Sequence, residues 1–142
     1  DAEGFHDACR FAKTGGTTSL LMMGKGEPTL YPDDIDTYLD LAARWEFPSI
    51  ELQTNALDIG WLANDGVARD QKAITVERLQ RWRQKRLRTI AISVADVVHG
   101  PNQETFLHHR PKEQYPDLGT TVRFLHALGF LPGFQYRAYQ TL

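Results

Sequence analysis

Thr18-Ser-Leu-Leu-Met-Met-Gly-Lys-Gly-Glu-Pro28 is the segment of this 142-residue sequence that says most about its architecture. Residues 18–23 form a short, largely apolar run of strand length, and the two glycines and the proline that follow predict the end of the strand. The apolar side chains are continuous and do not alternate with polar ones. This pattern predicts a strand that is buried on both faces of a sheet.

Helices and strands are predicted to alternate on either side of this segment. The predicted order is a helix at 4–13, the strand at 18–23, a helix from 33, a strand at 49–53, a helix from 75, a strand at 89–94, a helix from 117 to 129 and a strand after 130. Residues 64–72 and 95–116 are polar and predict loops. The alternation predicts an α/β fold with a parallel sheet and right-handed crossovers. A barrel segment and a doubly wound sheet both fit it.

The composition argues against several classes of partner, metal site and membrane segment. A chain of 142 residues suits one domain, 1–142, and its formal net charge of −2 indicates no nucleic-acid or anionic-membrane partner. The single cysteine, Cys9, excludes a disulfide framework or a multi-cysteine metal site within the chain. No apolar run reaches the ~20 residues of a membrane span, and no signal-peptide pattern is present. The cytoplasm is the expected compartment.

Small or polar residues follow each of the first three predicted strands. Ligands of parallel α/β folds bind at the carboxyl ends of the strands, so these residues are predicted to share one site. The candidate binding residues are Gly24, Gly26, Glu27, Pro28, Thr54, Asn55, Ser93 and Asp96.

Physical roles follow for the first group of candidates. The glycines flanking Lys25 let the backbone approach a ligand closely, or adopt conformations that a Cβ would forbid. A buried Glu27 could accept hydrogen bonds from a ligand ammonium group, and Pro28 fixes the following turn. The alternative is an ordinary strand-to-helix turn in which Glu27 is a solvated surface acid.

Residues 24–29 partly match two known glycine motifs. A P-loop fails because Ser19 stands where its first glycine belongs and Gly26 follows the lysine. The dinucleotide fingerprint Gly-x-Gly-x-x-Gly fits at Gly24 and Gly26 but has Thr29 at its third glycine. Glu51 would then be the ribose-binding acid, and a dinucleotide-binding α/β module is the second hypothesis.

Four segments together resemble the radical S-adenosylmethionine superfamily. Residues 21–30, Leu-Met-Met-Gly-Lys-Gly-Glu-Pro-Thr-Leu, resemble its Gly-Gly-Glu-Pro motif region. Residues 51–56 resemble the next strand, which often ends in Thr-Asn-Gly, and residues 90–94 resemble the strand after it. Residues 125–129 resemble the end of a later helix. The segments occur in the family's order.

The resemblance implies a segment of a partial (β/α)6 TIM-like barrel. It implies S-adenosylmethionine bound beside a 4Fe-4S cluster, which cleaves it to a 5′-deoxyadenosyl radical that removes a hydrogen atom from a substrate. Gly26 and Glu27 would contact the methionyl amino group. Ser93 and Asp96 would lie near the ribose, and Thr54 with Asn55 would line the same cavity. The resemblance leaves the substrate unassigned.

The sequence departs from the family pattern at three points. Lys25 replaces the first glycine of the usual pair, and Ala56 replaces the glycine after Thr-Asn. The Cys-x3-Cys-x2-Cys run that holds the cluster is missing, and the lone Cys9 is predicted to be a half-buried helix residue. We therefore expect residues 1–142 to be a fragment, inactive alone, that begins after the first strand and cluster loop and lacks the end of the barrel. A non-catalytic binding domain of the same fold is the alternative.

The histidines of the 95–116 segment and the basic residues around Trp82 are two further groups with a candidate role. His99, His108 and His109, with Glu104 or Glu113, match no metal-ligand spacing and are predicted to be solvated loop residues. The basic residues around Trp82 could meet phosphates, but they also suit the wet face of a helix that buries Leu79 and Trp82. These basic residues are Arg78, Arg81, Arg83, Lys85, Arg86 and Arg88. Arg137 follows the last predicted strand, and in some members of the family that it resembles an arginine near there reaches the cofactor or a substrate carboxylate.

Overall fold

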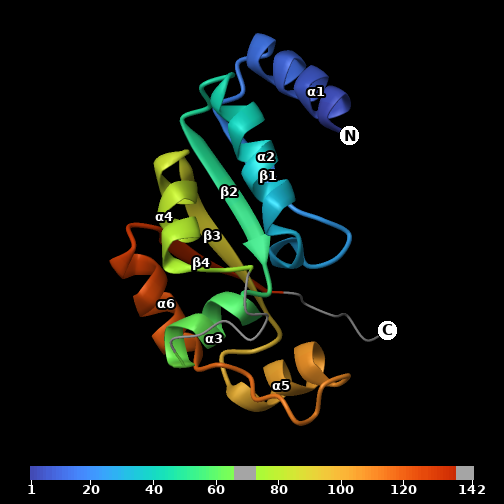
Figure 1. Ribbon diagram of the computed structural model, residues 1–142. Coiled ribbons are helices and arrows are strands. Elements are labelled where there is room, and N and C mark those ends of the chain that lie inside the picture. Colours follow the sequence, from blue (N-terminus) through green and yellow to red (C-terminus); the bar gives the residue numbers. More distant parts are fainter. Residues whose placement is uncertain (66–72, 137–142) are drawn as a thin grey trace.

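The computed structural model describes residues 1–65 and 73–136, and its helices and strands alternate along the chain (Figure 1). The elements are α1 (Ala2–Thr14), β1 (Ser19–Met22), the 3-10 turn η1 (Pro28–Leu30), α2 (Pro32–Ala43), β2 (Ser49–Thr54), α3 (Leu57–Asp65), α4 (Val76–Gln84), β3 (Leu87–Val94), α5 (His99–Leu107), α6 (Leu118–Ala127) and β4 (Leu131–Tyr136). Within the described ranges, no helix has the length and apolar character needed to cross a bilayer.

The four described strands form one parallel sheet in the order β1-β2-β3-β4. The α/β class and the parallel sheet predicted from the sequence are therefore confirmed. Each strand pairs with the next strand of the chain, so the order does not reverse anywhere among the described strands.

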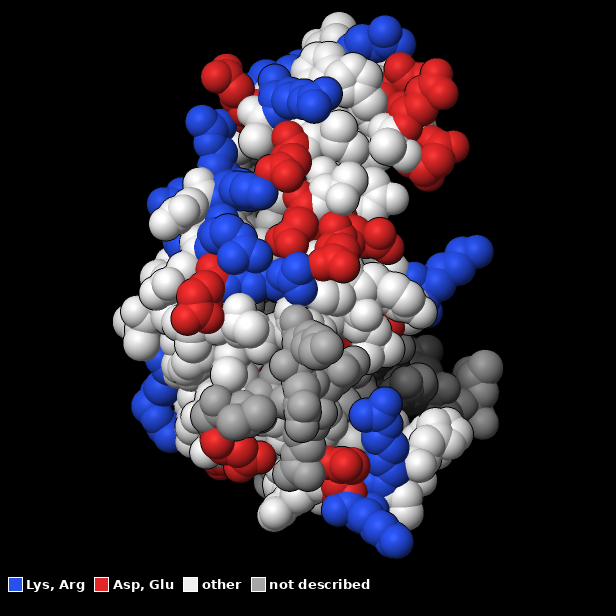
Figure 2. Space-filling model, viewed as in Figure 1, with Lys and Arg blue, Asp and Glu red and all other residues white. Residues whose placement is uncertain are grey.

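Helix α5 lies below the sheet in Figure 1, whereas α2, α4 and α6 bury side chains in one core on one face of the sheet. Their outer surface carries interleaved acidic and basic side chains (Figure 2). Ion pairs join α4 to α2: Arg78 contacts Asp33 and Asp36. Lys85, just after α4, pairs with Asp40 in the same way. These contacts hold the two helices side by side on the solvent face.

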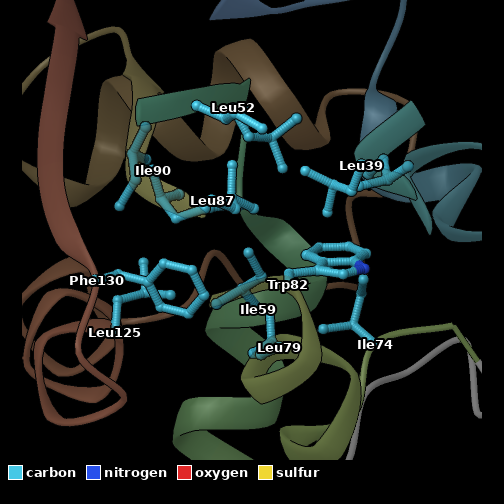
Figure 3. Close-up of a cluster of buried hydrophobic side chains, with 14 of the residues drawn as sticks. Leu39, Leu52, Ile59, Ile74, Leu79, Trp82, Leu87, Ile90, Leu125 and Phe130 are labelled. Carbon is cyan, nitrogen blue, oxygen red and sulfur yellow. The ribbon is translucent and has the colours of Figure 1, made fainter. Parts of the chain in front are cut away.

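A hydrophobic core fills the space between these helices and the sheet (Figure 3). Leu52 of β2 and Ile90 of β3 point toward the helices, and Trp82 of α4 is fully buried against them. The indole Nε1–H of Trp82 donates to the Asp36 carboxylate, which satisfies its one polar atom. The prediction that Leu79 and Trp82 face inward is confirmed.

The second face of the sheet has a different character. Leu21 and Met23, on or just after β1, are 53% and 62% exposed. The prediction that this strand is buried on both faces is wrong, because the core covers only one side of it. The register places Glu51 beside Thr89 and Gln53 beside Ala91, so polar side chains alternate with the core residues and point to this face.

Helix caps agree with the sequence prediction. Thr75 Oγ1 accepts a hydrogen bond from Arg78 N at 3.1 Å at the start of α4. Asp117 Oδ2 accepts one from Thr120 N at 2.7 Å at the start of α6. Gly129 follows α6 with a φ of 90°, a conformation that glycine adopts without steric cost.

Two predicted loops contain helix. The segment 95–116 includes α5, and Asn64 and Asp65 at the start of the segment 64–72 belong to α3. Among the residues of α5, only Asn102 and Leu107 are buried, so its sequence shows no apolar stripe. Residues 66–72 and Arg137 lie outside the described residues.

Candidate functional site

A pocket of about 240 Å³ lies at the carboxyl ends of β1, β2 and β3. Seven of the eight predicted site residues line it, namely Gly24, Gly26, Glu27, Pro28, Thr54, Asn55 and Ser93. Because the three strands are parallel neighbours, their carboxyl ends meet at one edge of the sheet. This edge is where ligands bind in parallel α/β folds.

Glu27 is the centre of the hydrogen-bond network in this pocket. Its Oε1 accepts from Thr29 N at 2.9 Å, from Thr29 Oγ1 at 2.6 Å and from Thr54 Oγ1. Its Oε2 accepts from Asn55 N at 2.7 Å. The carboxylate thus ties the loop after β1 to the end of β2. Glu27 is half-buried and held in place, unlike a solvated surface acid.

The two carboxylate oxygens of Glu27 differ in their remaining capacity to accept hydrogen bonds. Three donors surround Oε1, which fills its hydrogen-bonding capacity. Among the described residues Oε2 receives the single bond from Asn55 N, so one lone pair remains for a donor in the pocket. A donor in the pocket can therefore form a hydrogen bond with this carboxylate only at Oε2.

The end of β2 is a tight turn held by its own side chains. Thr54 Oγ1 accepts from Ala56 N at 2.9 Å, and Asn55 Oδ1 accepts from Leu57 N at 3.1 Å. Ala56 has a φ of 56°, in the left-handed region that glycine adopts most easily. The turn directs the backbone N–H of Asn55 at Glu27 and starts α3.

Gly24 and Gly26 do not have the conformation that a Cβ forbids. Among the described glycines, positive φ occurs at Gly16 and Gly129. A Cβ on Gly26 would meet nothing within 4 Å, and one on Gly24 would make only ordinary contacts, 3.6 Å from Gly26 O and 3.7 Å from Pro28 Cγ. Of the two predicted glycine roles, the conformational one is wrong. Gly24 and Gly26 leave the backbone at the pocket wall uncovered by a side chain.

Asp96 lies apart from the pocket. Its Oδ1 accepts from Val97 N at 2.6 Å and from Val98 N at 3.4 Å, and its carbonyl accepts from Asn102 Nδ2 at 2.6 Å. These bonds form the turn that leads into α5. The structure therefore brings Ser93, but not Asp96, to the predicted site.

Four further residues line the pocket, namely Met23, Lys25, Gln53 and Phe106. Gln53 is recognisable in the sequence as the last residue of the predicted strand 49–53, in which polar and apolar residues alternate. Phe106 carries no such signal, because it reaches the pocket from α5, whose packing the sequence pattern does not predict.

A second hollow of about 150 Å³ adjoins the first and shares Glu27, Asn55 and Phe106 with it. It adds Asp58, which is 5% exposed, and Arg110 to the lining. The two hollows give the carboxyl edge of the sheet room for a ligand that extends from the Gly24 loop toward α5.

Cys9 lies on α1, away from this edge, whereas His109 lines the adjoining hollow. Cys9 is buried on α1, more deeply than predicted, and burial raises the pKa of its thiol, so the thiol stays protonated. His99 lies in α5 with Nε2 3.0 Å from the carbonyl of Tyr115, and the rings of His108 and His109 lie in contact, tilted by 45° to each other. In residues 1–65 and 73–136, no group of three potential metal ligands converges.

The geometry does not match the dinucleotide fingerprint. The loop from Gly24 leads into η1, and α2 begins only at Pro32, so the glycines do not open a helix. Thr29 is buried and bonded to Glu27, and Glu51 does not line the pocket.

No protein-family model matches this chain. A search of curated proteins likewise gives no match. The residues around the pocket are therefore the basis for a functional proposal.

Proposed function

We propose that this chain binds S-adenosylmethionine in the pocket at the carboxyl ends of β1, β2 and β3, as a core segment of a radical S-adenosylmethionine enzyme. The observation that carries the proposal is the Glu27 carboxylate, which joins Thr29 of the first loop to Thr54 and Asn55 at the end of β2. These are the two segments that resemble consecutive motifs of that superfamily. They are distant in sequence and share one pocket.

The backbone at Ala56 supports the resemblance independently. The family pattern has glycine at this position, and Ala56 adopts a left-handed conformation with a φ of 56°. A non-glycine residue in this region costs about 1–2 kcal/mol. Ala56 thus departs from the family pattern in its side chain, while its backbone keeps the left-handed conformation that glycine adopts most easily.

The sheet supports assignment to a partial (β/α)6 barrel. The strand order β1-β2-β3-β4 follows the chain, and α2, α4 and α6 contribute to one core on one face. A barrel has this arrangement, whereas a doubly wound sheet reverses its strand order at the ligand site. The polar second face, with Gln53 and Ser93, would then face the barrel interior.

The pocket residues fit the polar groups of S-adenosylmethionine. The free lone pair of Glu27 Oε2 suits the methionyl ammonium group, and charge assistance strengthens such a bond. The bare backbone at Gly24 and Gly26 offers N–H and C=O groups without a side chain in the way. The Ser93 hydroxyl stands at the end of β3, where it can bond to a ribose hydroxyl.

The 4Fe-4S cluster does not fit the residues of this chain. Three thiolates are needed to hold it, and the chain has one cysteine, which is buried and protonated. The cluster of the proposed enzyme would supply the electron that cleaves S-adenosylmethionine, and its ligands would lie outside residues 1–142. The role derived for this chain is to bind and orient the cofactor.

Equilibrium dialysis with S-adenosylmethionine tests the proposal. The substitution Glu27→Gln keeps the size of the side chain but presents an N–H₂ where Oε2 accepts. We expect affinity to fall by about tenfold or more, equivalent to about 1.4 kcal/mol. Glu51→Gln is the matched control, since it removes a carboxylate from β2 that does not line the pocket, and it should leave affinity within about twofold.

Three outcomes would contradict the proposal. One is the absence of saturable binding, and another is equal affinity in the Glu27→Gln variant and the native chain, with thermal unfolding confirming that both are folded. The third is tighter binding of NAD⁺ or FAD than of S-adenosylmethionine in parallel titrations. That result would favour a dinucleotide-binding module.

A further inference from the structure

A separate hollow lined by arginines lies at the opposite end of the sheet from the proposed S-adenosylmethionine pocket. It has a volume of about 400 Å³ and is lined by Pro48, Arg83, Arg86 and Arg88. Pro48 and Arg86 directly precede β2 and β3, and Arg88 is the second residue of β3. The hollow therefore sits at the amino ends of the strands, and it shares no lining residue with the pocket at their carboxyl ends.

Two of the three guanidinium groups are held by backbone carbonyls. Arg83 Nε donates to Gly129 O at 2.7 Å, and Arg86 Nη1 donates to Phe47 O at 3.4 Å. A carbonyl orients a guanidinium without neutralising it. These hydrogen bonds restrict the side chains of Arg83 and Arg86 before any ligand binds, so less conformational entropy is lost on binding.

The charges of these arginines are not balanced by carboxylates of the described residues. Ion pairs do occur nearby, since Arg78 pairs with Asp36 and Lys85 pairs with Asp40. None of the ion pairs between described residues involves Arg83, Arg86 or Arg88. The basic side chains in and after α4 thus fall into two sets. Arg78 and Lys85 pair with carboxylates of α2, whereas Arg83, Arg86 and Arg88 line an open hollow. Basic side chains gather over this part of the molecule (Figure 2).

We infer that this arginine hollow binds a small polyphosphate anion. A guanidinium fork matches two phosphate oxygens at once, and three forks around one hollow suit a ligand with several phosphoryl groups. A nucleic acid would need a basic surface that extends further, and the ion pair of Lys85 with Asp40 uses one of the neighbouring cations. The site goes beyond the proposed function, because it is separate from the cofactor pocket and does not depend on it.

Calorimetric titration of the 142-residue chain with sodium tripolyphosphate tests the inference. We expect saturable binding of one anion per chain that weakens between about 50 mM and about 200 mM NaCl. Arg88→Gln should reduce affinity by about tenfold or more. The side chain of Arg88 is exposed, so this substitution should not disturb folding. Arg83→Gln should reduce affinity as well, and Arg88→Lys should have an intermediate effect because it keeps the charge but loses the fork.

Arg81→Gln is the matched control. Arg81 is an exposed arginine of the same helix that does not line the hollow, so affinity should stay within about twofold. Equal losses in the Arg81→Gln and Arg88→Gln variants would overturn the inference, because the effect would then be diffuse surface charge. Absence of saturable binding would also overturn it. Tighter binding of a single-stranded oligonucleotide that depends on Arg81 would replace it with an extended nucleic-acid surface.

Discussion

Glu27 connects the first loop of the protein to its second strand through hydrogen bonds from Thr29, Thr54 and Asn55. Hydrogen bonds to a charged group each contribute about 1.5–3 kcal/mol to stability when they are well formed. The carboxylate therefore supports the pocket wall as well as offering a lone pair to a ligand. For this reason the binding test for Glu27 includes a measurement of folding.

Tyr115 provides a prediction about pH. Its side chain is 4% exposed and stacks on Phe106, and burial raises the pKa of its phenol to about 12. The unfolded chain releases the same proton near pH 10. Between about pH 10 and pH 12 the folded state thus binds more protons than the unfolded state, and stability falls as pH rises. The contribution of the neutral phenol is fully present below about pH 10.

Urea unfolding at about pH 8 and about pH 11 measures this effect. The native chain should lose more free energy of unfolding between the two conditions than the Tyr115→Phe variant, which has no phenol to titrate. The comparison between the two proteins removes the contributions of lysines and of the other tyrosines. Equal losses in both proteins would show that Tyr115 does not couple folding to alkaline pH.

At the level of the elements, α5 shows why part of the fold escaped the sequence pattern. The helix is organised by one polar side chain: Asn102 Oδ1 accepts from Ala95 N at 2.8 Å, and Asn102 Nδ2 donates to Asp96 O and Val98 O. These bonds depend on the chain turning back on itself after β3. An apolar stripe can be recognised from spacing, whereas a buried asparagine looks the same in a loop and in a helix.

The contact between α3 and α6 gives a prediction about a helix interior. Gly60 of α3 is buried, and a Cβ there would overlap Pro116 Cγ and stand 2.8 Å from Pro116 Cβ and 3.0 Å from Thr121 Oγ1. Gly60→Ala should therefore lower the free energy of unfolding by about 1–3 kcal/mol, although alanine is the better helix former by about 1 kcal/mol.

Gly100→Ala in α5 is the control for this prediction. A Cβ at Gly100 would meet nothing within 4 Å, so the substitution should leave stability unchanged or raise it by up to about 1 kcal/mol. Denaturant unfolding of the two variants and the native chain provides the measurement. A gain in stability for Gly60→Ala similar to that of Gly100→Ala would mean that α3 can move away from Pro116 at little cost.

Considered as a whole, the molecule has a sheet whose two faces have different surroundings. The core on one face joins β2 and β3 to α2, α4 and α6, while β1 and β4 form the edges of the described sheet. The strands of greatest local stability should therefore be the central pair, because their amides are both hydrogen-bonded within the sheet and covered by apolar side chains.

Native-state hydrogen exchange tests this distribution of stability. The backbone amides of β2 and β3, around Leu52 and Ile90, should exchange most slowly, at rates set by global unfolding. Those of β1 should exchange faster, and those of α1, which buries only Cys9, faster still. Amides of α1 that exchange as slowly as those of β3 would contradict a core centred on the middle strands.

The amino-acid sequence was sufficient to predict the alternation of helices and strands, the caps at Thr75 and Asp117 and most of the pocket residues. These features depend on short-range spacing: apolar periodicity, capping side chains and the residue that follows each strand. Parallel strands bring their carboxyl ends to one edge, so the class of fold alone was enough to gather Glu27, Thr54 and Ser93.

Only the tertiary structure decided the strand order, the exposure of Leu21, the place of Phe106 in the pocket and the separation of Asp96 from it. The conformation of Ala56 also became known only there, since alanine is usually right-handed. Each of these depends on contacts between segments that are far apart in the chain. Such contacts are set by which surfaces can be buried together, and spacing along one segment carries no information about that choice.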